Sequence, residues 1–132
     1  MTAAEQPLHG RGILVTRPVG TAAPLCELIR DAGGEAVRFP AIDILPPADP
    51  DAVRALLSPA NLARQSAVIF VSPTAVSMAF ELMQGAWPAG VAVAAVGKGT
   101  ARALRARGVQ QVLVPADGAD SEALAALPAL QE

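Results

Sequence analysis

The sequence predicts an α/β fold of two doubly wound, parallel-sheet lobes joined by extended linker strands. Short apolar runs alternate along the chain with segments whose apolar residues recur at helical spacing. The intervening segments are long enough for the helical crossovers that join parallel strands. A proline-rich stretch at residues 39–48 interrupts this alternation and indicates a passage from one lobe to the other.

The first lobe is predicted to begin with a strand over residues 12–16, an aliphatic run between Gly12 and Arg17-Pro18. A helix should follow, capped by Thr21 or an adjacent residue and ended by Gly33-Gly34. A second strand is expected over residues 35–39. The members of the predicted helical stripe are Leu25, Leu28 and Ile29.

The linker combines extended residues with prolines. Residues 42–45 form an extended stretch, closed by Pro46-Pro47 and Asp49-Pro50. This composition favours residues 1–38 as a piece of the first lobe, 39–48 as linker strands and 49–132 as the second lobe.

The second lobe should contain three strands and four helices. The strands are expected at residues 67–71, 91–96 and 112–115. The helices are expected over 51–62, from Ser72-Pro73 onward, from Thr100 to about Arg107, and from Asp120-Ser121 onward with Leu124, Leu127 and Leu130.

Composition and charge exclude several classes of function. The net charge of −2 is spread over both halves, so neither nucleic acid nor an anionic membrane surface is an expected partner. The first six residues lack the pattern of an export signal, and the apolar run at 91–96 is too short to span a bilayer. The single cysteine, Cys26, lies in a helical pattern and is typical of a buried thiol in a reducing compartment, which favours the cytoplasm.

Polar groups follow the predicted strands at the points where an open parallel sheet binds its ligands. The residues concerned are Arg17, Ser72, Gly97, Thr100 and Ser121. Each can be explained alone as a helix cap, a solvated cation or a flexible glycine. Together they would place a row of donors along one sheet edge, which suits a ligand with many carboxylates or phosphates.

The known motifs of nucleotide-binding, metal and nucleophilic catalytic sites do not match this sequence. Gly97-Lys98-Gly99-Thr100 lacks the spacing of a P-loop, and no Gly-x-Gly-x-x-Gly fingerprint occurs. His9 has no histidine or cysteine at ligand spacing, so no metal site is expected. Ser72 has neither a nucleophile elbow nor a histidine base, so nucleophilic hydrolysis is not expected.

Five segments resemble, in order, the landmarks of the uroporphyrinogen-III synthase family. They are residues 13–18, 39–44, 68–76, 95–104 and 114–124, so the resemblance runs from about Gly12 to Leu130. One departure is Pro73-Thr74, where many relatives carry Asn or Arg, and this places the contribution of that turn in doubt.

The resemblance implies a lyase of tetrapyrrole and heme biosynthesis that dehydrates and cyclises hydroxymethylbilane, with inversion of the last pyrrole ring and without metal or organic cofactor. It implies a monomeric parent of about twice this length, with a discontinuous first lobe, so that both lobes are incomplete here. The same resemblance places Arg17, Ser72, Gly97, Thr100 and Ser121 around the substrate, with Thr100 the best candidate near the reacting end. The proton donor stays unidentified, because the family's proposed tyrosine lies in a later segment and this chain has no Tyr.

Two other functions are compatible with the same residues. A noncatalytic α/β module would bind an anionic metabolite through these turns without turnover. A structural remnant would use them only as helix caps. The synthase interpretation further predicts that this truncated chain is inactive or nearly so by itself.

Overall fold

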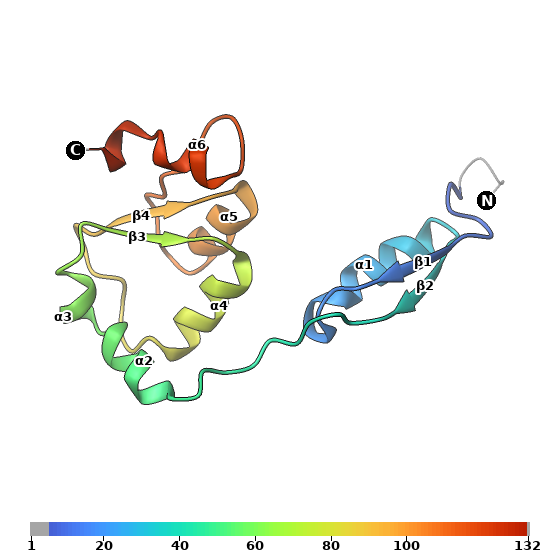
Figure 1. Cartoon of the computed structure of the whole chain (residues 1–132), viewed down its shortest axis with the longest axis horizontal. Helices are drawn as coiled ribbons and strands as arrows, with labels where there is room; N and C mark the ends of the chain where they lie inside the picture. The colour runs from blue at the N-terminus through green and yellow to red at the C-terminus, as the bar shows by residue number, and fades with distance from the viewer. Residues whose placement is uncertain (1–5, 132) are drawn as a thin grey trace. The chain divides into compact units, whose positions relative to one another are not determined.

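The computed structural model describes residues 6–131 as an α/β chain in two compact units (Figure 1). The units comprise Met1–Leu45 and Pro46–Glu132. Each contains a pair of parallel strands, with one helix in the first unit and several in the second, so the predicted α/β class and the two lobes are confirmed. Within residues 6–131, no helix has both the length and the apolar character needed to cross a membrane.

Unit 1 is one strand–helix–strand repeat. Its elements are β1 (Gly12–Val15), α1 (Val19–Asp31) and β2 (Glu35–Arg38). β1 and β2 pair in parallel, with Leu14 opposite Val37. The link between two parallel strands has to cross the sheet, and α1 makes that crossing.

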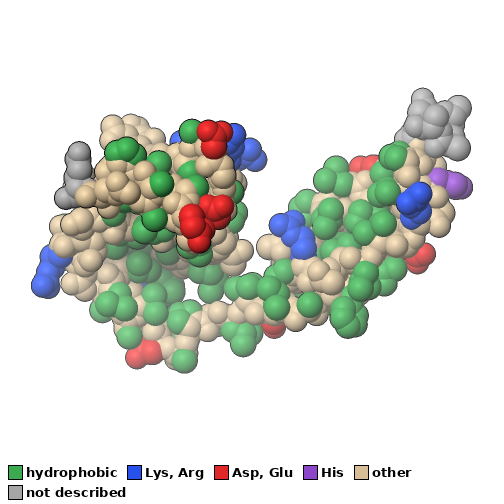
Figure 2. Space-filling view, turned by 45° about the horizontal axis from the view of Figure 1, so that its top comes forward, with side chains coloured by type: hydrophobic (Ala, Val, Ile, Leu, Met, Phe, Trp, Pro, Cys, Tyr) green, Lys and Arg blue, Asp and Glu red, His purple; other side chains and the backbone are tan. Residues whose placement is uncertain are grey.

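The core of unit 1 is small and lies between α1 and one face of its sheet. Its buried members are Val15, Ala22, Cys26 and Ile29. Strand residues alternate between faces, so Leu14 points away from this core and is 58% exposed. Figure 2 shows hydrophobic side chains over much of the visible surface of the unit that carries His9. Unit 1 thus buries one face of its sheet and leaves apolar side chains on the other.

The ends of α1 differ in how well the sequence predicted them. Pro18 occupies the N-cap, and no side chain caps the helix. The Thr21 hydroxyl donates to the Pro18 carbonyl instead (3.3 Å), so Thr21 as the cap was wrong. The glycine stop is confirmed: Gly33 has φ +83°, and its amide donates to the Arg30 carbonyl (2.8 Å).

The chain continues beside β1 for a few residues after β2. The amide of Phe39 donates to Val15 O (2.9 Å), and that of Ala41 donates to Thr16 O (3.1 Å). Residues 42–45, predicted as extended, form no strand in the structure. Pro46 and Pro47 follow and cannot donate to a strand ladder, so no paired strand continues through them.

Unit 2 carries the second parallel pair and most of the helices. Its strands are β3 (Ala67–Phe70) and β4 (Ala92–Ala95), which pair with Ile69 opposite Ala94. Its helices are α2 (Pro50–Leu56), α3 (Pro59–Leu62), α4 (Pro73–Leu82), α5 (Lys98–Ala106) and α6 (Ser121–Ala125), followed by the 3-10 turn η2 (Pro128–Leu130).

Helices lie on both faces of the β3–β4 pair. On one face, α4 and α5 pack on Phe70, Val93 and Ala95, and the fully buried Leu104 of α5 lies in this cluster. On the other face, residues of α6 and η2 line a hollow together with Ile69 and other strand residues. Coverage of both faces is the arrangement expected of a doubly wound sheet.

Three predicted elements of unit 2 differ in the structure. The helix expected over 51–62 is split, because Ser58 and Pro59 begin a new helix. The strand expected over 112–115 is reduced to one parallel bridge between Leu113 and Ala94. The last helix ends at Ala125, ahead of Pro128, so Leu127 and Leu130 lie outside it.

Candidate functional site

The β3–α4 turn is held by Ser72. Its Oγ accepts a hydrogen bond from the Ala75 amide (3.1 Å), and Pro73 follows at the first helical position. A serine hydroxyl that accepts in this way still has its own proton to donate. Among the hydrogen bonds of residues 6–131, none uses Ser72 Oγ as donor. The cap predicted from the sequence is therefore confirmed, and one donor is left over.

The β4–α5 turn is built on Gly97, which is the N-cap of α5 and makes no side-chain cap. The first amides of a helix lack intrahelical partners, so those of α5 are available to an outside acceptor. Helix α5 begins at Lys98, ahead of the predicted start at Thr100. Thr100 therefore lies inside the first turn, only 4% exposed, and is a buried polar residue instead of the cap.

The segment before α6 differs from the prediction in its cap. The Asp120 carboxylate accepts from the Ala123 amide (2.8 Å), so Asp120 alone caps the helix and Ser121 is its first residue. The Ser121 side chain is exposed and lies on the rim of the hollow shared with Val71 and Val96. These two residues are the last before the Ser72 and Gly97 turns.

Three strand exits of unit 2 meet at one edge. The Val96 amide donates to Phe70 O (3.3 Å), which joins the ends of β3 and β4. A Cβ placed on Gly99 would lie 3.9 Å from Pro73 Cγ, and one on Gly97 would lie 3.7 Å from Ala119 Cβ. We call this the donor edge; its members are Ser72, Gly97, Thr100 and Ser121.

Arg17 is the predicted site residue that belongs to the other unit. It is the second residue after β1, and it is exposed. It occupies the position at the carboxyl end of a parallel strand that the sequence predicted.

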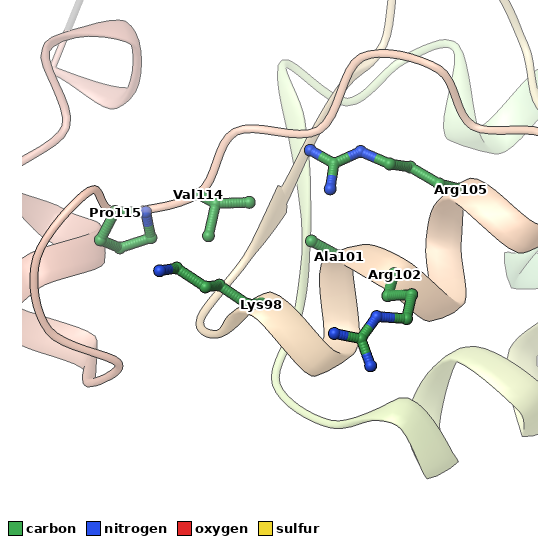
Figure 3. A pocket seen from close by; sticks show the side chains of 6 residues that line it. All are labelled: Lys98, Ala101, Arg102, Arg105, Val114 and Pro115. Atoms are coloured by element: carbon green, nitrogen blue, oxygen red, sulfur yellow. The ribbon is translucent and has the colours of Figure 1, made fainter.

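A hollow beside α5 contains cations that the sequence prediction did not single out. It has a volume of about 390 Å³ and is lined by Lys98, Arg102 and Arg105 with Ala101, Val114 and Pro115 (Figure 3). The helical spacing of the three cations was the signal that could have revealed it.

The described part of the chain offers no cluster of side chains suited to a metal ion. Within residues 6–131, no three His, Cys, Asp or Glu side chains gather closely enough to hold one. Cys26 is fully buried in the core of unit 1, and no other cysteine occurs in the sequence.

Parallel strand pairs joined by helical crossovers define an α/β protein, a class in which ligands commonly bind at the carboxyl ends of the strands. Residues 23–132 match the family model described as uroporphyrinogen-III synthase HemD. The chain is also 32% identical over 117 residues to the uroporphyrinogen-III synthase of Synechococcus elongatus (strain ATCC 33912 / PCC 7942 / FACHB-805). The match covers 85% of this chain and 43% of that relative, so the chain spans less than half of the relative's length. The chain belongs to the uroporphyrinogen-III synthase family, a family of lyases in tetrapyrrole and heme biosynthesis.

Proposed function

We propose that this chain supplies part of the substrate site of a uroporphyrinogen-III synthase. The reaction is the dehydration and ring closure of hydroxymethylbilane to uroporphyrinogen III, with inversion of the last pyrrole ring. The observation that carries this proposal is the donor edge of unit 2, in a chain whose residues 23–132 match the family model. A cytoplasmic location and a monomeric parent belong to the same proposal.

The chemistry of the substrate suits such an edge. Hydroxymethylbilane carries eight carboxylates, and its electron-rich pyrrole can expel the terminal hydroxyl. The protein mainly has to hold the chain curled, protonate the departing oxygen and keep water away. Hydrogen bonds from amides and hydroxyls to carboxylates are charge-assisted and stronger than neutral ones.

Each residue of the predicted site has a role in this proposal. The Ser72 proton and the first amides of α5 bind substrate carboxylates. Thr100 lies in the same turn as those amides and is the best candidate for a contact near the reacting end. Ser121 supplies a further hydroxyl, and Arg17 supplies a cation from unit 1.

We include in the proposal that the chain alone turns over substrate poorly. Unit 1 buries four hydrophobic residues in its core and leaves Leu14, Val37 and Phe39 at 58%, 43% and 61% exposure. A sheet of two strands with one open apolar face is marginal in isolation. Further polypeptide packed on that face would be needed to hold Arg17 in place.

The test is a product-isomer assay. Hydroxymethylbilane is given to the chain alone and to a chimera in which the chain replaces the matching part of the Synechococcus elongatus relative. Oxidised products are separated into uroporphyrin I, which spontaneous closure yields, and uroporphyrin III. We expect isomer III from the chimera and mainly isomer I from the chain alone.

Two results would overturn the proposal. A folded chimera that yields only isomer I would refute the assigned function. Normal turnover to isomer III by the chain alone would refute the need for further polypeptide. Calorimetric titration of the chain with uroporphyrin III provides a second measurement if the chimera fails to fold. Saturable binding is expected, and its absence would contradict the role of the donor edge.

A further inference from the structure

The hollow beside α5 is lined by three cations and by no acid. Lys98, Arg102 and Arg105 occupy positions i, i+4 and i+7 of one helix, so they form a line about 10 Å long. Figure 3 shows the Lys98 and Arg105 side chains extending from α5 on the side of Val114. Ala101, Val114 and Pro115 complete the lining with apolar surface. We call this feature the basic groove.

Among the described residues, no salt bridge involves Lys98, Arg102 or Arg105. Within residues 6–131, the salt bridge of the structure joins Arg54 to Asp51, away from α5. Asp120, the residue after Ala119, accepts the capping bond of α6. A fourth cation, Arg107, lies over the Phe80 ring at 5.9 Å from its centroid and takes no part in the groove.

We propose that the basic groove binds carboxylates of an organic anion with an apolar framework. Guanidinium groups match a carboxylate in a two-pronged geometry, and two arginines with a lysine along one helix suit several carboxylates better than one compact anion. The apolar lining would contact the hydrocarbon between the carboxylates. A volume of about 390 Å³ lies within the range of small-molecule sites.

The basic groove extends the donor edge, because Lys98 is both the first residue of α5 and a member of the groove. The identity of the ligand rests on the proposed function: a substrate with eight carboxylates needs more partners than the donor edge contains. The groove then holds side-chain carboxylates of the tetrapyrrole at a distance from the reacting end. It contributes to substrate affinity and specificity and not to the chemical step.

The test compares two double variants with equal loss of charge. Arg102→Gln/Arg105→Gln removes cations from the groove, and Arg30→Gln/Arg64→Gln removes exposed cations elsewhere. Uroporphyrin III is titrated into each protein and into the unmodified chain at fixed ionic strength, and porphyrin fluorescence gives the Kd. Parallel titrations with inorganic phosphate measure competition by a compact anion.

We expect the Kd of the groove variant to rise about tenfold or more, since two charge-assisted interactions are lost, and the control variant to change less than threefold. Phosphate at the same ionic strength should compete weakly. An equal Kd in the groove variant and the unmodified chain would overturn the proposal. Full displacement by millimolar phosphate would also overturn it, since it would indicate a site for any small anion.

The isomer assay separates this inference from the proposed function. If the chimera makes isomer III and Arg102→Gln/Arg105→Gln leaves its KM unchanged, the groove proposal is wrong while the function stands. If the groove variant loses uroporphyrin binding but no chimera makes isomer III, the groove stands while the function is wrong.

Discussion

Ser72 allows the capping and binding functions of the donor edge to be separated. Its Oγ accepts from the Ala75 amide at 3.1 Å, and its own proton has no acceptor in the described part of the chain. Ser72→Ala removes both functions. Ser72→Asp keeps a cap of similar quality, because aspartate also accepts the amide bond, but replaces a donor by a negative charge.

The magnitudes follow from the local geometry. Loss of an N-cap costs about 1 kcal/mol, within a range of about 0.5–2 kcal/mol. With a slope of about 1–2 kcal/mol per M for a small domain, Ser72→Ala should lower the urea midpoint of unit 2 by about 0.5–1 M. Ser72→Asp should leave the midpoint within about 0.3 M. A negative charge beside a bound carboxylate, at an effective dielectric constant of about 20, should weaken uroporphyrin binding by about tenfold or more.

Trp87 reports the unfolding of unit 2. It is the only tryptophan of the sequence, and its ring centroid lies 6.0 Å from that of Phe70 and 5.9 Å from that of Phe80. Ser77→Ala is the matched control, because Ser77 lies inside the same helix and away from its cap. Ser72→Asp with both a normal urea midpoint and a normal Kd for uroporphyrin III would refute the binding role and leave Ser72 as a cap alone.

Four further changes test other parts of the structure. Leu104→Ala, at a fully buried site, should cost unit 2 about 2–5 kcal/mol, read from the Trp87 urea midpoint; a loss below 1 kcal/mol would contradict the described core. Gly108→Ala should cost about 1–2 kcal/mol in the same assay, because Gly108 has φ +90°, and an unchanged midpoint would argue against this helix end. In the isolated chain, Cys26 should react with a thiol reagent at urea concentrations that leave Trp87 fluorescence native, since unit 1 has the smaller core; simultaneous transitions would show that the units unfold together. Thr100→Val in the chimera should lower the rate of isomer III formation about tenfold or more. The free energy of unfolding, read from Trp87 fluorescence, should change by less than about 2 kcal/mol, and an unchanged rate would remove Thr100 from the site.

The sequence pattern predicted most of the architecture because local signals and tertiary packing agree there. Ser72-Pro73 begins α4, Gly33 ends α1, and the apolar run at 67–71 contains β3. These signals depend on a few neighbouring residues: a capping oxygen, a proline without an amide proton, a glycine with positive φ. Such features act within one turn of the chain and can be read from single positions.

The errors arise where pairing or competition between caps decides the outcome. The run at 112–115 has the composition of a strand, but a ladder needs a partner along its length, and only Leu113 forms a bridge. Asp120 and Ser121 are both good caps, and only the backbone geometry shows that the carboxylate accepts the bond. Ser58-Pro59 is itself a cap signal, and it begins a new helix inside the apolar pattern of 51–62.

The candidate site was predictable as a set of strand exits but not as a surface. Parallel strands place their carboxyl ends at one edge, so the grouping of Ser72 with Gly97 follows from fold class alone. The position of Ser121 depends on how the chain returns across the sheet after Leu113, which no local pattern specifies. The basic groove likewise needs Val114 and Pro115 beside α5. These two residues lie outside the helix, so its periodicity does not reveal the contact.

The most direct test of the donor edge is a nuclear magnetic resonance titration of the ¹⁵N-labelled chain with uroporphyrin III. We predict saturable shifts of the amides of Ala75, of residues 97–100 and of Ser121, at the carboxyl ends of the strands. The amides of Gly90, Gly108 and Gln111, which line hollows near the start of β4, should stay unshifted. Saturable shifts confined to this second group, or no saturable shift in the first, would contradict the account.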